Sequence, residues 1–307
     1  MVWRRVAANQ DGQINKVNEA TMCRLYRAGA ALLTAVLLGR AQAQSDVTAP
    51  PPPAEPAAEP TPASASSSKF EGAVGLVLDY KPAFSGSSDR KVRPHLAGFL
   101  RYGRFTITGA GGFTTKRQDD VQRGLDAELV RREDVRINLA LRVDQGRRES
   151  ASSQLAGMGN IRATVRTRLG LRWEPAPKWA VSMAGSADSL GRGGGYFGDT
   201  GVSRTFTIDA RQRVILGANV AVGGSRYMQT WYGVTEQQSA ASGYPVYKPG
   251  AGLRDVGTSA TWRIDVNPEW AGFTSLGVTR LLGPAAGSPL TRQPNSYSIA
   301  AGIARRF

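Results

Sequence analysis

The sequence contains a single cysteine, Cys23, and a single histidine, His95. A disulfide needs two thiols, and a structural metal site needs several thiolate or imidazole ligands, so this composition excludes both. Cys23 precedes an apolar run, whereas a lipoprotein cysteine follows one directly. We therefore expect no metal, no cofactor and no lipoprotein attachment at Cys23.

Long apolar runs are also scarce. Hydrophobic residues make up 41% of the chain, and the run at residues 30–39 is only ten residues long. A transmembrane helix needs about 20 apolar residues. A β-barrel has an equally polar composition, because only every second residue of each strand contacts lipid. Composition therefore leaves soluble and barrel proteins open, and periodicity must separate them.

Acidic residues are outnumbered, with 24 Asp and Glu against 39 Lys and Arg and a formal net charge of +15. Such an excess is typical of nucleic-acid-binding proteins. Here the arginines are spread over many segments, and the sequence has neither a basic helix nor a zinc-finger spacing. We therefore expect no nucleic-acid partner.

The N-terminal region has the pattern of a cleaved export signal. Arg24 and Arg27 form a positive segment, the apolar run 30–39 follows, and Ala41 and Ala43 give a small-x-small cleavage pattern. We predict cleavage after Ala43, so that residues 1–43 are the signal peptide, and we expect the protein in the outer membrane of a Gram-negative cell.

Two segments beside this signal have no folding pattern. We interpret residues 1–21 as an extension from a misassigned start codon, with the natural start at Met22; a long native N-terminal region is the alternative. Residues 44–69 are rich in Pro, Ala and Ser and cannot bury a core, so we predict a disordered tether. A spacer is the simplest role for it, and a segment reaching toward the cell wall is the alternative.

Polar and apolar residues alternate through much of residues 70–307. For example, Val135 and Ile137 alternate with Arg136 and Asn138. A period of two residues is typical of a strand with one apolar face. The pattern covers residues 70–80, 135–144, 161–173, 179–188, 214–223, 256–266 and 297–307.

Short and long connections strictly alternate between the predicted strands. A soluble β-sandwich also has alternating strands, but outer-membrane barrels combine them with short periplasmic turns and long outer loops. Five short and six long links predict an all-β, transmembrane, antiparallel up-and-down β-barrel of about 12 strands over residues 70–307. The short links are residues 103–104, 132–133, 174–178, 209–212 and 267–268, and the long links are 81–92, 115–122, 145–160, 191–198, 224–255 and 283–295.

The last predicted strand resembles the C-terminal signal read by the outer-membrane assembly machinery. One of its faces carries Tyr297, Ile299, Ile303 and Phe307. Arg305 departs from the usual apolar residue, but it lies near the membrane interface, where a charge costs little. We expect these four apolar and aromatic residues to act as the assembly signal, with that machinery and outer-membrane lipid as partners.

Seven short motifs occur in order along the predicted barrel. They are FSGSSD (residues 84–89), YGRF (102–105), GRRES (146–150), LAGMG (155–159), YGVT (232–235), QSAASG (238–243) and RLLG (280–283). Together they resemble the MipA/OmpV family of MltA-interacting outer-membrane proteins. The resemblance implies an outer-membrane barrel, a lytic transglycosylase and murein-synthesis proteins as partners, and a scaffolding role. It supplies no catalytic residues.

A row of arginines on the polar strand face is a candidate lumen site. Its members are Arg136, Arg142, Arg162, Arg166, Arg168, Arg172 and Arg263, and the acids on the same face are Glu71, Asp79, Asp126, Glu128, Asp144, Asp188 and Asp265. The row would attract anions into an open lumen. Alternatively, the arginines and carboxylates pair with one another and fill the barrel. We favour the filled interior, because a barrel of this strand number has little spare lumen.

The longest predicted loop, residues 224–255, carries five large aromatic residues. They are Tyr227, Trp231, Tyr232, Tyr244 and Tyr247. Exposed aromatic side chains are typical of a recognition surface. The alternative, with equal weight, is that the loop folds back over the barrel mouth and uses these rings as its own small core. The sequence leaves both readings open.

No catalytic site is predicted. His95 follows Pro94 on a predicted strand, and the chain has no Gly-x-Ser-x-Gly elbow. The Gly-rich residues 191–195 lack the Lys-Ser/Thr and the helix of a phosphate-binding loop. The sequence therefore predicts a structural scaffold of the cell envelope rather than an enzyme. The alternatives are a small-solute or anion channel and recognition through a surface loop.

Overall fold

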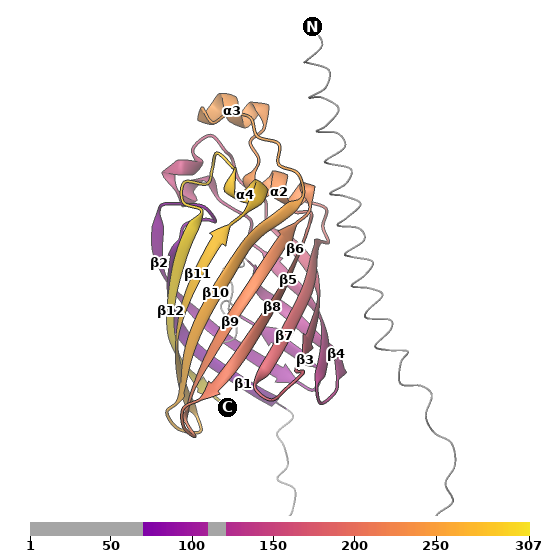
Figure 1. Ribbon diagram of the computed structural model, residues 1–307, viewed down its shortest axis with the longest axis vertical. Helices are drawn as coiled ribbons and strands as arrows, with labels where there is room; N and C mark the ends of the chain where they lie inside the picture. Colours follow the sequence, from indigo (N-terminus) through magenta and orange to yellow (C-terminus); the bar gives the residue numbers. More distant parts are fainter. Residues whose placement is uncertain (1–69, 110–120) are drawn as a thin grey trace, which may run out of the picture. The chain divides into compact units, whose positions relative to one another are not determined.

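The computed structural model describes residues 70–109 and 121–307. In this part of the chain, twelve strands form one closed barrel in which each strand pairs antiparallel with its neighbours in sequence and β12 pairs with β1 (Figure 1). The predicted fold is therefore confirmed. The strands are β1 (Phe70–Pro82), β2 (Arg90–Tyr102), β3 (Phe105–Thr108), β4 (Val121–Arg131), β5 (Val135–Asp144), β6 (Thr164–Trp173), β7 (Trp179–Asp188), β8 (Tyr196–Thr207), β9 (Gln212–Gly223), β10 (Gly252–Asp265), β11 (Trp270–Leu281) and β12 (Asn295–Arg306).

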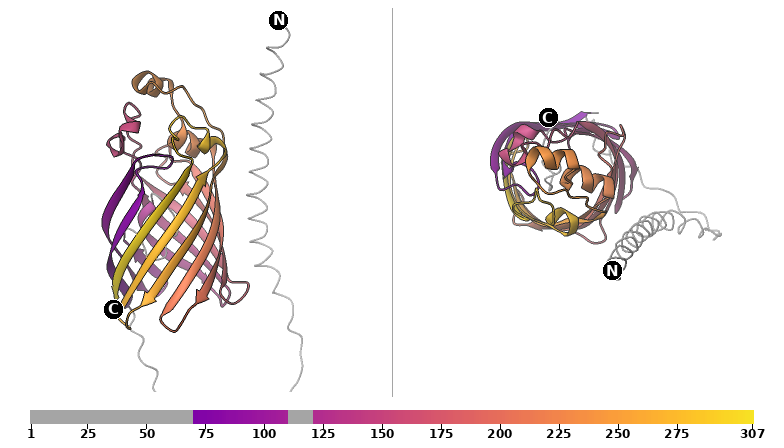
Figure 2. Two further views of the ribbon diagram at one scale, coloured as in Figure 1. Left: turned by 60° about the vertical axis from the view of Figure 1, so that its left-hand side comes forward. Right: turned by 90° about the horizontal axis from the view of Figure 1, so that it is seen from above.

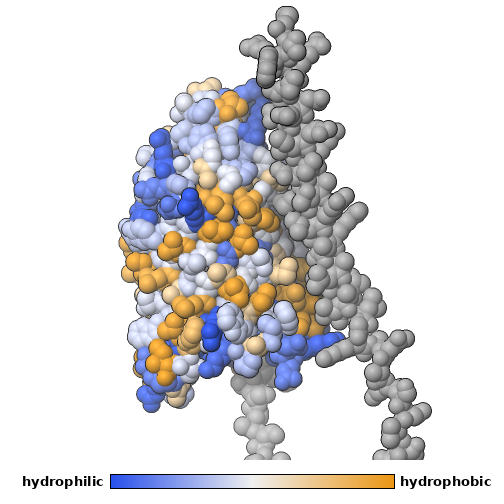
Figure 3. Space-filling view, viewed as in Figure 1, coloured by the Kyte–Doolittle hydropathy of each residue, from blue (hydrophilic) through white to orange (hydrophobic). Residues whose placement is uncertain are grey.

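The alternating sequence sorts side chains between the two faces of the wall. On β6, the side chain of Leu169 is 46% exposed on the outer surface, whereas Arg166, three residues earlier, is 1% exposed. On β5, Ala140 and Asp144 are buried while Leu139 and Leu141 are exposed. Apolar residues are accordingly spread over the barrel wall, and the end that carries the helices is largely hydrophilic (Figure 3). An outward apolar band of this kind is what a lipid-facing barrel surface requires.

All five predicted short links are turns at one end of the barrel. The turn between β2 and β3 has only two residues, and its first, Gly103, has φ +57°, a conformation that a glycine adopts without strain. By the usual rule for outer-membrane barrels, the end with the short turns faces the periplasm. The long connections that the structure describes then gather at the outer end, and most of the predicted link at residues 115–122 lies outside the described residues.

One predicted strand begins later than expected. The alternation predicts a strand from residue 161, but β6 begins at Thr164. Ile161 instead forms an isolated antiparallel bridge with Arg147, which closes the connection between β5 and β6 into a loop of its own. The periodic pattern marks polarity, and it cannot distinguish a strand from an extended loop arm.

Helices in the long connections lie across the outer opening of the barrel, as the view from above shows (Figure 2). The connection after β9 forms α2 (Ser225–Tyr232) and α3 (Glu236–Ser242), and the one after β11 forms α4 (Gly283–Ala286). Two short 3-10 helices, η1 (Glu149–Ala151) and η2 (Ser153–Leu155), lie in the connection after β5. We call α2, α4 and residues 189–195 the outer cap.

The seam between the first and last strands is closed by backbone hydrogen bonds. The amide of Phe307 donates to the carbonyl of Gly72, and the amide of Gly72 donates to the carbonyl of Phe307, both at 3.0 Å. A Cβ at position 72 would lie 2.7 Å from the Phe307 ring, so the ring rests directly on a residue that has no side chain. The predicted signal peptide and tether lie outside the described residues and stay predictions.

Candidate functional site in the lumen and at the outer mouth

The predicted arginine row lies mainly on two neighbouring strands. Five of its members, on β5 and β6, are Arg136, Arg142, Arg166, Arg168 and Arg172. Arg263 lies apart from them on β10, and Arg162 lies in the exposed connection before β6 rather than on a strand. The structure therefore brings five of the seven residues together on one part of the wall.

Carboxylates of β4 and β8 pair with the arginines in the middle of this wall. Arg142 Nη2 lies 2.6 Å from Asp126 Oδ2, and Asn138 donates to the same carboxylate at 3.2 Å. Arg168 Nη2 lies 2.7 Å from Asp199 Oδ1 on β8. Charge-assisted hydrogen bonds of this kind are the arrangement in which a sheltered charge is tolerated. These charges therefore cross-link strands inside the barrel.

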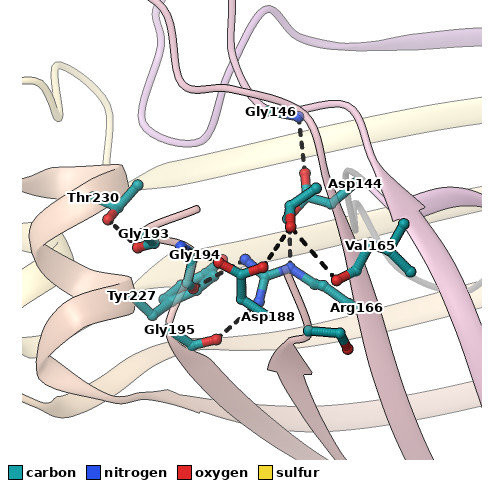
Figure 4. Close-up of polar contacts among 12 residues, drawn as sticks. Asp144, Gly146, Val165, Arg166, Asp188, Gly193, Gly194, Gly195, Tyr227 and Thr230 are labelled. Atoms are coloured by element: carbon teal, nitrogen blue, oxygen red, sulfur yellow. Dashed lines mark hydrogen bonds and ion pairs between the residues drawn. The ribbon is translucent and has the colours of Figure 1, made fainter. Parts of the chain in front are cut away.

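Arg166 is the most completely enclosed member of the row (Figure 4). Its Nε donates to Asp144 Oδ2 at 2.6 Å, and its terminal nitrogens donate to the carbonyl oxygens of Gly194 at 3.0 Å and Gly195 at 3.2 Å. The guanidinium also lies 5.5 Å from the ring centroid of Tyr227, within cation–π range. Arg166 thus joins the barrel wall to the outer cap.

The Gly-rich loop beside Arg166 supplies acceptors rather than a phosphate cradle. The carbonyl of Gly193 accepts a hydrogen bond from Thr230 of α2 at 2.5 Å, and the amide of Gly194 donates to Asp188 at 2.8 Å (Figure 4). A Cβ at Gly195 would lie 2.5 Å from the Tyr227 backbone nitrogen, so only glycine allows α2 to approach this closely. The loop is therefore a fitted part of the outer cap.

The aromatic residues of α2 are covered and not displayed. Tyr227, Trp231 and Tyr232 are at most 8% exposed and pack with Phe197 and Leu281 in one apolar cluster. These three rings therefore do not form an exposed recognition surface, because the loop folds over the barrel mouth and removes their apolar surface from water. Of the two readings that the sequence left open, burial favours the loop with its own core.

The ring of Tyr227 contacts two arginines from different strands, Arg166 on β6 and Arg254 on β10. The Arg254 Nη1 atom donates to Tyr227 Oη at 2.9 Å, and its guanidinium lies 5.7 Å from the ring centroid. The register of β10 against β9 shifts between Leu253 and Asp255, an irregularity in which Arg254 is left out of the pairing. The outer cap is therefore fastened both to β6, through Arg166, and to β10. Sequence reasoning missed Arg254, and no pattern in the sequence marks the irregularity.

Tyr244 and Tyr247 are half-buried against a second apolar cluster built around Phe84, Leu155 and Leu290. Tyr247 Oη donates to the carbonyl of Pro284 in α4 at 2.9 Å. Burial raises the pKa of the Tyr247 hydroxyl above its ordinary value, because the ionised form loses its hydration there. The second cluster joins connections from four different places in the sequence above the barrel.

His95 is on β2, and its Nδ1 lies 3.7 Å from Asp79 Oδ2, which also lies 3.3 Å from Lys81 Nζ. The placement is that of a lumen histidine beside a carboxylate and an ammonium group. Within residues 70–109 and 121–307, no group of three or more His, Cys, Asp or Glu side chains is placed to hold a metal ion. No helix in the same ranges is long and apolar enough to cross a bilayer.

The four residues of the predicted assembly signal lie on the outer face of the last strand or directly after it. Tyr297, Ile299, Ile303 and Phe307 are all exposed. The ring of Tyr297 stacks with the guanidinium of Arg90, 3.5 Å from its centroid. Their placement leaves the assembly role a prediction.

A closed antiparallel barrel with an outward apolar band and an interior of paired charges defines an outer-membrane β-barrel protein. The family described as MltA-interacting protein MipA matches residues 74–307, and the chain belongs to this family. No curated protein matches the sequence.

Among solved structures, the chain is similar to the KdgM porin, with 9% identity, a TM-score of 0.38 and coverage of 76% of this chain and 99% of that chain. It is similar to the NanC porin, with 8% identity, a TM-score of 0.40 and coverage of 76% and 98%. A loop L8 deletion mutant of OmpT, an outer membrane protein of Vibrio cholerae, shares 5% identity, with a TM-score of 0.36 and coverage of 78% and 98%.

Proposed function

We propose that this outer-membrane barrel is a non-catalytic scaffold that holds a lytic transglycosylase, and with it murein-synthesis proteins, at the periplasmic face. The observation that carries the proposal is the outer cap. Its segments come from the long connections and lie over the outer opening of the barrel, and the buried Arg166 attaches them to the wall. A barrel closed in this way is poorly suited to free conduction. The description of its family as MltA-interacting supports a lytic transglycosylase as the partner.

The contact surface is then expected at the periplasmic end, where a wall enzyme works. The candidates are the cleaved chain's tether, residues 45–68, and the turns at residues 174–178 and 209–212. In the turn at residues 209–212, Asp209 Oδ1 accepts hydrogen bonds from the amides of Arg211 and Gln212, each at 2.7 Å. The hydrogen bond from the Arg211 amide holds the pKa of Asp209 below its ordinary value, which favours the ionised carboxylate in this turn.

Removal of residues 45–68 tests the scaffold. Co-purification of lytic transglycosylase from cross-linked envelopes should fall several-fold, while the heat-modifiable barrel stays at its normal level in the outer membrane. The matched control replaces the same segment with a Gly/Ser linker of equal length, which keeps the reach but changes the chemistry. The proposal fails if recovery of the enzyme is unchanged by this deletion and also by replacement of the turns at residues 174–178 and 209–212.

A small-solute or anion channel is the second candidate. The observation in its favour is that inward residues on β9 to β12 are mainly Gly, Ala, Ser and Thr, which fill less space than the arginines of β5 and β6. Planar-bilayer recording decides between the two functions. We expect little steady conductance from the native barrel and a clear rise after Tyr227→Ala combined with Trp231→Ala, with Tyr244→Ala as control. Steady native conductance together with empty pull-downs would instead support the channel.

A further inference from the structure

Three arginines surround one carboxylate at the periplasmic end of the lumen. Arg213 Nη2 donates to Asp265 Oδ2 at 2.8 Å, and Arg306 Nη2 donates to Asp265 Oδ1. Arg263 Nε lies 3.7 Å from the same Oδ1 atom. We call these four residues the Asp265 cluster.

Strand register explains why these side chains meet. Arg213 on β9 is the direct partner of Arg263 on β10, and both alternate with the outward-facing Trp262 and Val214, which also pair. Asp265 follows Arg263 by two residues and therefore lies on the same face. Arg306 is the last residue of β12 and reaches the cluster from the far side of β11.

Positive charge exceeds negative charge here. Three guanidinium groups share Asp265, and two carboxylates near the ends of β1 and β11 pair with other arginines: Glu71 lies 3.3 Å from Arg101, and Glu269 lies 3.1 Å from Arg305. Like charges this close repel one another, most strongly where water is partly excluded. The Asp265 cluster therefore holds an uncompensated positive charge that an additional anion would neutralise.

The cluster is also accessible and has donors to spare. The three arginine side chains are between 33% and 43% exposed, so solvent reaches all of them. A guanidinium carries five N–H donors, while the described hydrogen bonds of Arg213 and Arg306 each use one nitrogen, on Asp265. The next inward charge along β10 is Asp255, at the opposite end of the strand. No charged neighbour on that strand competes for a ligand.

We propose that the Asp265 cluster is a binding site for an oxyanion group, a carboxylate or a phosphate, that enters the lumen from the periplasm. Guanidinium forks match the paired oxygens of both groups. Arg213 and Arg263 are direct register partners on β9 and β10, so their side chains leave neighbouring positions on the same face of the sheet. Asp265 positions the forks and competes with the ligand. The site goes beyond the scaffolding role, since a barrel that holds no wall enzyme would still bind an anion here.

Two sources of this chemistry exist in the periplasm: free inorganic phosphate and the carboxylates of the peptide stems of peptidoglycan. Isothermal titration of the refolded full barrel with sodium phosphate, and separately with a soluble disaccharide-peptide fragment of peptidoglycan, distinguishes them. Tighter binding of the fragment assigns the site to the wall, and tighter binding of phosphate assigns it to the free ion. Absence of saturable binding for both probes overturns the proposal.

Variants locate the binding. The combination of Arg213→Gln with Arg263→Gln should weaken the better probe by at least an order of magnitude. Arg305→Gln changes a neighbouring arginine that faces outward and pairs with Glu269, and it should leave affinity unchanged. Equal affinities in these two variants would place the anion elsewhere.

Asp265→Asn provides a test with the opposite sign. It removes the internal competitor while keeping the size of the side chain, so binding of the anion should become several-fold tighter. Unchanged or weaker binding would contradict the proposal. Heat-modifiable migration of each variant confirms folding before titration, and this variant stays informative even where the double arginine variant does not fold.

Discussion

Arg166 is the residue through which the barrel wall and the outer cap depend on each other. Replacing it with Met leaves Asp144, which is buried, without its cation and the carbonyls of Gly194 and Gly195 without their donor. Removing one partner of a buried ion pair costs about 3–5 kcal/mol, because the remaining charge stays desolvated. Urea titration of the refolded barrel should therefore show a loss of this order for Arg166→Met.

The matched control for that change is Arg172→Met on the same strand. Arg172 pairs with Glu174 at 2.9 Å, but both side chains are more than a third exposed. An exposed pair contributes about 0–1 kcal/mol, so the control should change stability little. Similar losses in the two variants would mean that burial of Arg166 does not determine its contribution.

Leu169 tests which face of β6 meets lipid. The side chain is exposed on the outer surface near the middle of the strand, and Leu169→Arg should lower the free energy of unfolding by about 2–4 kcal/mol at mid-membrane depth. The same substitution at Val135, the first residue of β5 at the periplasmic end, should cost about 0–1 kcal/mol. Equal costs in refolding titrations into lipid would show that depth is misassigned.

At this scale the sequence predicts the face of a side chain but not its surroundings. Alternation places Arg166 and Arg172 on the same face, since a strand has a period of two. Yet one is buried under a helix and the other is exposed at a turn. That difference depends on which loop covers which end, and local pattern does not carry this information.

Among the elements, the outer cap has a titratable attachment at Tyr247. Burial raises its pKa above the ordinary value of 10.0. A raised tyrosine pKa means that folding favours the protonated form, so its contribution is complete below about pH 10 and is lost as pH rises through the folded-state pKa. Ionisation also removes the proton donated to Pro284. We expect the outer cap to loosen in strong alkali.

Subtilisin cleavage of residues 224–251 measures this loosening. At pH 8 the native protein should be cleaved more slowly than Tyr247→Phe, which lacks the hydrogen bond to Pro284. The difference between the two should disappear once the pH exceeds the folded-state pKa of Tyr247, which lies above 10.0, and Tyr244→Phe should not reproduce it. A difference that persists into alkali would exclude Tyr247 as the titrating group.

Strands and turns follow from sequence more fully than helices do. The short links are set by local chemistry, and β7 has the predicted bounds, Trp179 to Asp188. Helix α2 was not predicted, although its buried Tyr227, Met228, Trp231 and Tyr232 have the i, i+1, i+4, i+5 spacing of one helical face. Within a loop of a barrel this signal is short, and tertiary packing decides whether the helix forms.

For the whole molecule, closure of the barrel depends on the seam between β1 and β12. Deleting Phe307 removes the paired backbone hydrogen bonds to Gly72 and the ring that covers it. We expect less heat-modifiable barrel in the outer membrane, measured by unheated electrophoresis of envelopes from natively expressed protein. Phe307→Tyr keeps an aromatic terminus and should assemble normally. Wild-type levels after the deletion would argue against an assembly role.

The strand number and the closed topology could be predicted because alternation and link length act along the entire chain. The outer cap and the Asp265 cluster could not, since each depends on residues brought together from distant strands. Arg213 and Arg306, for example, are separated by 93 positions in the sequence. They meet only because the closed sheet brings both side chains to the carboxylate of Asp265. Such sites follow from register and closure, which no single segment specifies.

The way the outer cap is fastened has a consequence for a nicked chain. A cut at the exposed Pro245–Val246 bond would leave one fragment that ends just after α3 and carries α2, whose Tyr227 contacts Arg166 of the same fragment. The other fragment continues into β10, whose Arg254 donates a hydrogen bond to the same Tyr227. Neither fragment is released, because each also contributes strands to one closed sheet. A nicked molecule should therefore migrate as a single intact barrel until it is boiled, and only then separate into two pieces.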